Sequence, residues 1–152
     1  MDGAFDRLTR PLGYRVSRVS SYDVTGGNAD AWMGIAPGET RVLADLDGPG
    51  VIRHVWTTIA SSDPLYLRKI LFRIYWDDEP NPSVETPAGD FFGLSHGRAY
   101  TYQCAAFSTS ANENGRVDIG VAMNCWLPMP FRKKARIEIE NQQEKTLEGI
   151  YF

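Results

Sequence analysis

The sequence has little cysteine or histidine, which limits the metal chemistry that it can support. It contains two cysteines, Cys104 and Cys125, and two histidines among its 152 residues. Neither cysteine belongs to a CxxC pair or a Cys/His cluster, so a zinc site is not expected. No metal ligand and no cofactor is assigned, and whether a metal binds through oxygen ligands stays open. Apolar neighbours predict that both thiols are buried, and pairing of the two is the alternative.

Targeting signals and long apolar runs are missing as well. The first residues, Met1–Asp6, lack the basic stretch and apolar core of a signal peptide. No apolar run approaches the roughly 18 residues of a membrane span. We therefore expect a cytoplasmic protein that does not enter a membrane, with a secreted precursor as the alternative.

The chain has no excess of positive charge. Acidic residues outnumber basic ones by 19 to 16, which gives a net charge of −3. A nucleic-acid partner is not expected, because phosphate binding requires a basic surface. The one basic cluster, residues 132–134 with Arg136, is interpreted as the solvated face of a strand.

What the sequence does contain is period-two alternation of apolar and polar residues, which is typical of half-buried strands. The alternation is clearest at Arg132–Glu140, Leu67–Trp76 and Val117–Met123. Further strands are expected at Thr40–Leu46, at Val51–Ile59 and, more weakly, at Tyr100–Phe107.

The fold class follows from this pattern. The only helical spacing is at residues 3–9, before Pro11. Strands with one apolar face each, and no helix long enough for a crossover, predict a single all-β domain over residues 1–152. This domain is an antiparallel β-sandwich with at most one short helix. Leu147–Phe152 reads as a further apolar strand without a partner, an edge that another segment or chain must cover.

The segment Ser20–Trp32 is the first candidate for a binding site. Asp23, Asn28 and Asp30 supply hydrogen-bond acceptors and Trp32 supplies a flat apolar ring. Sugars need both kinds of group, since their hydroxyls take polar partners and their C–H faces take an aromatic ring. The alternative is that the acids form Asx-turns with the backbone of their own loop.

Two further segments carry acids. Trp76–Pro87 contains Glu85 and three prolines, and Ala88–Gly97 contains Asp90 between two glycines and two phenylalanines. These acids are candidate substrate-binding groups, although adjacent acids on a hairpin are more often solvated. Phe91 and Phe92 are expected to pack in the core.

The segment Asn124–Phe131 has a rigid apolar sequence with two prolines. Such a segment is core in a monomer and a contact surface in an oligomer. The interface candidates are Trp126, Met129, Phe131 and Tyr151. His54 and Trp56 share a strand face and are interpreted as packing residues.

Four segments, taken in order, resemble glycoside hydrolase family 172. They are Ser20–Asp30 (SSYDxTGGNxD), Asp47–Trp56 (DGPGxIxHxW), Pro82–Gly93 (PSVExPxGDFFG) and Asn124–Phe131 (NCWxPMPF). The resemblance implies a jelly roll, the first of two in tandem, and a carbohydrate substrate such as a fructofuranoside or arabinofuranoside. One departure is Asp77-Asp78-Glu79, where Asp-Gly-Glu is expected and the loss of the turn glycine is expected to alter the hairpin.

The resemblance also implies assembly as a trimer or hexamer, with the active site at a protomer boundary. The family's two catalytic glutamates belong to the second jelly roll, so no residue here is assigned a catalytic role. The first hypothesis is therefore the N-terminal half of a furanosidase, inactive by itself. The alternative is a non-catalytic jelly-roll protein that self-assembles or binds sugar, and the least favoured reading is a stand-alone hydrolase.

Overall fold

The computed structural model describes residue 11, residues 13–111 and residues 120–152. The helix expected at residues 3–9, and residues 117–119 of one expected strand, lie outside this part of the chain. The strands of the described part are β1 (Thr40–Asp47), β2 (Gly50–Ile52), β3 (Val55–Ala60), β4 (Ile70–Trp76), β5 (Val84–Pro87), β6 (Tyr102–Gln103), β7 (Phe107–Ala111), β8 (Val121–Cys125), β9 (Met129–Phe131), β10 (Lys134–Asn141) and β11 (Gly149–Tyr151).

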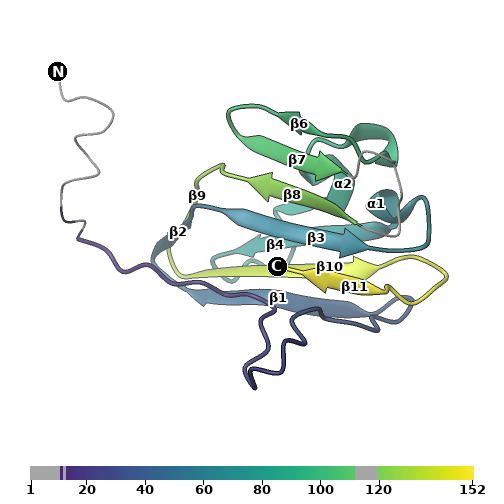
Figure 1. The fold of residues 1–152 in the computed structure, drawn as a ribbon. Coiled ribbons are helices and arrows are strands. Elements are labelled where there is room, and N and C mark those ends of the chain that lie inside the picture. The colour runs from purple at the N-terminus through teal and green to yellow at the C-terminus, as the bar shows by residue number, and fades with distance from the viewer. Residues whose placement is uncertain (1–10, 12, 112–119) are drawn as a thin grey trace.

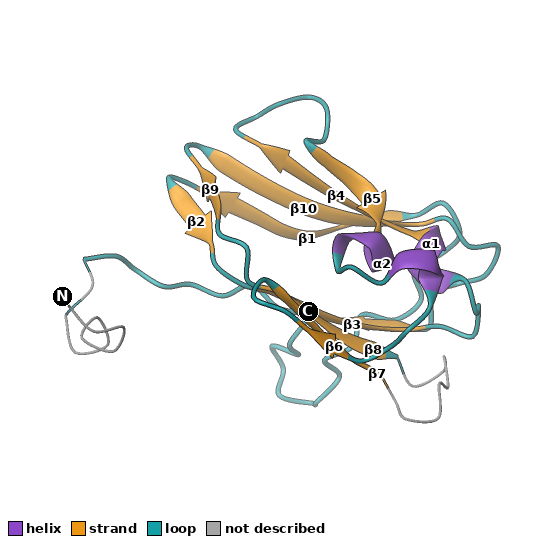
Figure 2. Ribbon diagram, turned by 90° about the horizontal axis from the view of Figure 1, so that it is seen from above, coloured by secondary structure: helices purple, strands orange, loops and turns teal. Residues whose placement is uncertain are grey.

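The strands form two facing sheets (Figures 1 and 2). One sheet has the order β1-β10-β4-β5 and the other β11-β3-β8-β7-β6, while β2 and β9 form a two-stranded ribbon at one end. Every pairing between these strands is antiparallel. The all-β sandwich expected from the alternation is confirmed.

Helical structure in the described residues is limited to single turns. The helices α1 (Tyr66–Lys69) and α2 (Ala88–Phe91) have four residues each, one helix more than expected, and a 3-10 turn spans Ser95–Gly97. Both helices lie at one end of the sandwich, between the two sheets (Figure 2). None of the described helices is long and apolar enough to cross a membrane.

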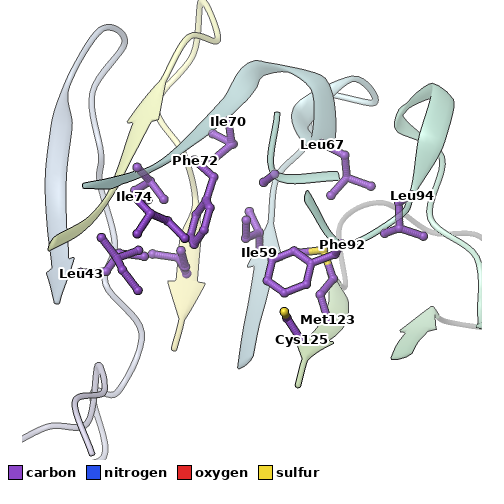
Figure 3. Packing of buried hydrophobic residues seen from close by; sticks show 14 of the residues in the cluster. Leu43, Ile59, Leu67, Ile70, Phe72, Ile74, Phe92, Leu94, Met123 and Cys125 are labelled. Carbon is purple, nitrogen blue, oxygen red and sulfur yellow. The ribbon is translucent and has the colours of Figure 1, made fainter. Parts of the chain in front are cut away.

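The core lies between the sheets and is built from the inward positions of alternating strands. On β4 and β8 these positions are Ile70, Phe72, Ile74, Val121, Met123 and Cys125, all buried. Phe91 and Phe92 pack against Phe72 at ring-centroid distances of 4.7 and 6.2 Å, so their expected packing role is confirmed (Figure 3 shows Phe92 and Phe72). Burial of this apolar surface is the main driving force for folding.

The expected strand at Val51–Ile59 is two strands in two different sheets. β2 pairs with β9, and β3 pairs with β8 and β11. The burial pattern shifts at this break. The buried residue of β2 is the even-numbered Ile52, whereas the buried residues of β3 are the odd-numbered Thr57 and Ile59. A one-residue shift sends every later side chain to the opposite face. His54 and Trp56 therefore point outward, so Trp56 does not pack in the core as predicted, and His54 packs at the surface, on Trp126.

The start of the expected strand at Leu67–Trp76 is also different, because residues 67–69 belong to α1. The carboxylate of Asp63 accepts hydrogen bonds from the backbone N–H of Leu65 at 2.8 Å and from Lys69 Nζ at 2.7 Å. The first bond closes the turn that leads into α1, and the second ties Lys69, the last residue of α1, to that turn. Asp63 and Pro64 thus form a turn ahead of α1, whose N-cap residue is Leu65.

The apolar C-terminal segment is paired on both sides, and of the two covers expected for it, another segment or another chain, the structure shows a segment of the same chain. β11 pairs with β3 on one side, while Trp32 exchanges two backbone hydrogen bonds with Ile150 on the other, at 2.9 and 3.1 Å. The backbone N–H of Leu147 donates to the carbonyl of Ile35 at 2.9 Å. The stretch from Ser20 to Ile35 therefore covers the edge that the sequence left open.

The two cysteines are in different environments. Cys125 is buried on β8, and burial raises the pKa of its thiol. Cys104 is exposed, so its predicted burial is wrong, and both thiols are free.

Candidate functional site

The Ser20–Trp32 loop bonds largely to itself. Asp23 Oδ1 accepts from the N–H and hydroxyl of Thr25, at 2.9 and 2.7 Å, and Oδ2 accepts from Ala29 N–H at 3.2 Å. Asp30 Oδ1 accepts from the N–H of Asp23 at 2.8 Å. The Thr25 hydroxyl, together with these backbone donors, lowers the pKa of Asp23. These are the Asx-turn bonds of the alternative interpretation.

The other two candidates in this loop differ in role. Asn28 has a φ of 62°, in the left-handed region that asparagine tolerates better than most residues, and its side chain is exposed. Trp32 packs edge-on against Phe152, with ring centroids 4.8 Å apart. Trp32 thus holds the loop against β11, while Asn28 faces solvent.

Glu85 and Asp90 lie away from this loop, beside the four-stranded sheet. Glu85 accepts a 3.0 Å hydrogen bond from Arg73 Nε, and Asp90 forms an ion pair with Arg68. The candidate acids of the sequence are therefore divided between two regions. In these contacts, no side-chain carboxylate of one candidate acid is paired with the side-chain carboxylate of another.

The outer face of the four-stranded sheet is covered with paired charges. Arg73 bonds both Glu85 and Glu140, at 3.0 and 2.6 Å. Glu138, nearly buried, accepts from the Tyr75 hydroxyl and from Arg136, each at 2.8 Å. The Glu138 carboxylate, as the largest cause, raises the pKa of Tyr75.

A depression of about 300 Å³ opens on this charged face. It is lined by Asp45, Tyr75, Asp78, Glu79, Pro80, Lys134 and Arg136. The Arg136 guanidinium lies 4.6 Å from the centre of the Tyr75 ring, and Lys134 Nζ lies 3.3 Å from Asp45 Oδ2. Its lining mixes three acidic side chains with two basic ones, so the depression does not present charge of a single sign.

The outer face of the five-stranded sheet has the opposite chemistry. Its strand positions, assigned from register and burial, and the two residues that extend it are His54, Trp56, Thr58, Ala60, Gln103, Ser108, Ser110, Ala122, Asn124, Trp126 and Tyr151. We call this set the aromatic face. It holds no acidic residue, lysine or arginine among these described positions. Trp56, Trp126 and Tyr151 keep 39%, 41% and 42% of their surface exposed.

Side chains at one end of the aromatic face are ordered by their own contacts. The His54 ring stacks on Trp126, with centroids 5.4 Å apart and planes at 6°. His54 Nε2 lies 2.9 Å from Asn124 Oδ1, and Asn124 Nδ2 donates to Ser108 Oγ at 3.3 Å. With the amide in this orientation, Nε2 carries the proton and donates. Trp56 is the cross-strand neighbour of Asn124.

The interface candidates of the sequence are distributed over three environments. Trp126 and Tyr151 belong to the aromatic face. Met129 is half-buried on the β2–β9 ribbon, opposite Ile52. Phe131 stacks on Trp76 at 6.5 Å and is buried, because its ring lies over Gly50, where a Cβ would be 2.7 Å from it. Phe131 is therefore a core residue rather than a contact surface.

The sequence did not identify His54, Trp56 and Asn124 as site residues. The signal that places Trp56 on the outer face is the inward alternation of Val55, Thr57 and Ile59. This signal is weak because its middle residue is a threonine, which is not strongly apolar. Among the described residues, no group of three or more His, Cys, Asp or Glu side chains could hold a metal ion.

The fold and its two outer faces define an antiparallel β-sandwich protein with one ion-paired face and one uncharged aromatic face. Residues 28–150 match the model of a family described as GH172 domain-like. The chain belongs to this family. No curated protein matches the chain.

Proposed function

We propose that this chain is the N-terminal jelly-roll half of a family-172-like glycoside hydrolase that acts on furanosides, either fructofuranosides or arabinofuranosides. In this proposal the chain shapes the active site and the oligomer, and the catalytic glutamates come from a second jelly roll. The family match over residues 28–150 supports the assignment to this class of hydrolase.

The contacts made by the candidate acids are the observation that supports a non-catalytic role. Retaining hydrolysis needs two carboxyls about 5 Å apart, one of them with a raised pKa. Asp23 has its pKa lowered by its own loop, and Glu85 and Asp90 are each paired with an arginine. In the described contacts each of these carboxylates is therefore engaged by its own loop or by an arginine, and none is paired with a second carboxyl.

The test is hydrolysis of nitrophenyl α-fructofuranoside and arabinofuranoside by the purified chain, with and without the polypeptide encoded directly after Phe152. We expect no turnover by the chain alone and turnover by the pair. Turnover by the chain alone that is lost in Glu85→Gln or Asp90→Asn would contradict the proposal and support a stand-alone hydrolase.

The second candidate function is a non-catalytic sugar-binding protein. The aromatic face favours it, because exposed tryptophan rings beside amides and hydroxyls suit sugars. Binding of furanoside polymers with no hydrolysis in either combination is the result that would favour this candidate.

A further inference from the structure

We propose that the aromatic face binds neutral polysaccharide, with the rings of Trp56 and Trp126 as stacking platforms and Asn124 as the central hydrogen-bonding group. This inference does not depend on which sugar the proposed hydrolase cleaves. It concerns a surface whose residues take no part in the acid chemistry considered above.

Charge is the first argument for a neutral ligand. The face carries no acidic residue, lysine or arginine among its described positions, whereas the opposite outer face is covered by ion pairs such as Arg73–Glu140 at 2.6 Å. A nucleic acid or acidic glycan requires basic groups. The charge pattern therefore matches an uncharged partner.

Side-chain type is the second argument for a sugar. Beside the rings of Trp56 and Trp126, the aromatic face presents amide and hydroxyl groups from Thr58, Gln103, Ser108, Ser110 and Asn124. Met33, which lies over Gly149, and the exposed Leu127 border this set. Sugars present hydroxyls around a C–H face that stacks on aromatic rings, and this combination of groups matches both parts.

Preorganisation is the third argument. His54 stacks on Trp126 at 5.4 Å and its Nε2 bonds Asn124, which in turn donates to Ser108. The indole and the amide are therefore held by neighbours before any ligand arrives. Binding to groups that are already ordered loses less conformational entropy.

Affinity electrophoresis in native gels tests the proposal, with inulin, arabinan or dextran as neutral probes and polygalacturonate as the charged control. Retardation by at least one neutral probe is expected, with about a tenfold weaker association in Trp126→Ala, the loss typical of an anchoring aromatic. Trp126→Phe should stay within about threefold of the unmodified chain, because the ring is retained. Asn124→Asp should weaken binding by introducing a charge.

Tyr14→Ala is the matched control, since Tyr14 is an exposed aromatic outside the aromatic face, and it should bind as the unmodified chain does. Near-ultraviolet circular dichroism establishes that each variant is folded. The proposal is overturned if no neutral probe retards the chain, or if Trp126→Ala binds unchanged. It is also overturned if polygalacturonate binds as well as the neutral probes, or if Trp126→Ala abolishes self-association instead. If dextran retards the chain and no furanoside is hydrolysed, polysaccharide binding by the aromatic face is supported. The proposed hydrolase function then fails separately.

Discussion

Asp77 and Lys133, 56 residues apart in sequence, are joined by a 2.6 Å hydrogen bond from the Lys133 backbone N–H to Asp77 Oδ1. The same oxygen accepts from the N–H groups of Arg132 and Lys134, at 2.8 and 3.3 Å. One carboxylate thus orders the turn between β9 and β10. These backbone donors, Lys133 foremost, lower the pKa of Asp77.

The first prediction is a pH-dependent effect of Asp77→Asn. Because the folded-state pKa is lowered, the carboxylate's stabilisation is fully present above its unfolded pKa of about 4. It is lost as the pH falls through the folded value. Asparagine tolerates the φ of 54° at this position, so the substitution isolates the charge.

Urea unfolding at pH 7 and pH 3 measures this effect. The urea midpoint of Asp77→Asn should lie well below that of the unmodified chain at pH 7, and the difference should shrink at pH 3. Asp78→Asn, at the adjacent exposed acid, is the control. An equal difference at both pH values would contradict the role assigned to the ionised carboxylate.

The second prediction concerns the neighbouring residue, where the sequence lacks the glycine expected from the resemblance. Asp77 and Asp78 both have positive φ, and the N–H of Glu79 donates to the carbonyl of Trp76 at 2.9 Å, as in a type I′ turn. Asp78 has a φ of 67°. Asp78→Gly should raise the free energy of unfolding by about 0.5–1 kcal/mol, because glycine adopts this conformation without strain.

Thermal and urea unfolding of Asp78→Gly and Asp78→Ala form the test. Alanine should lower the free energy of unfolding, because its side chain is unfavourable at positive φ. If alanine and glycine have the same effect, backbone strain at this position is not the cause.

Much of the fold follows from sequence pattern, whereas the surfaces do not. Ala135, Ile137 and Ile139 alternate with charged residues, and all three are buried on β10 as expected. The break after Ile52 was hidden because both of its halves are rich in β-branched residues. The aromatic face depends on which strands become neighbours, since Asn124 meets both Trp56 and Ser108 only across β3, β8 and β7. Such long-range pairing has no local signal.

The third prediction addresses a buried polar network that secures the C-terminal region. Asn141 is fully buried, and its Nδ2 donates to the carbonyls of Ile35 and Lys145, at 2.8 and 2.9 Å. Its Oδ1 accepts from the N–H and side chain of Gln143, at 3.0 and 2.9 Å. Asn141→Ala leaves these buried partners unpaired and should cost about 3 kcal/mol.

Urea unfolding gives the size of this loss, and amide hydrogen exchange gives its location. Faster exchange should appear at Leu147 and Ile150, whose N–H groups bond Ile35 and Trp32. The exposed neighbour Gln142→Ala should change stability by less than about 0.5 kcal/mol. A loss that small in Asn141→Ala would show that the network does not secure this region.

The fourth prediction is self-association through the β2–β9 ribbon. Val51 and Leu127 keep 47% and 45% of their surface exposed, beside the half-buried Met129. Because exposed aliphatic clusters favour contact with another chain, light scattering at micromolar concentration should give a mass of at least three chains, as the resemblance implies. Val51→Glu should lower that mass by placing a charge in the contact, whereas Trp126→Ala should leave it unchanged. A monomer of about 17 kDa with undiminished thermal stability would refute the association, and a lower mass in Trp126→Ala alone would move the contact to the aromatic face.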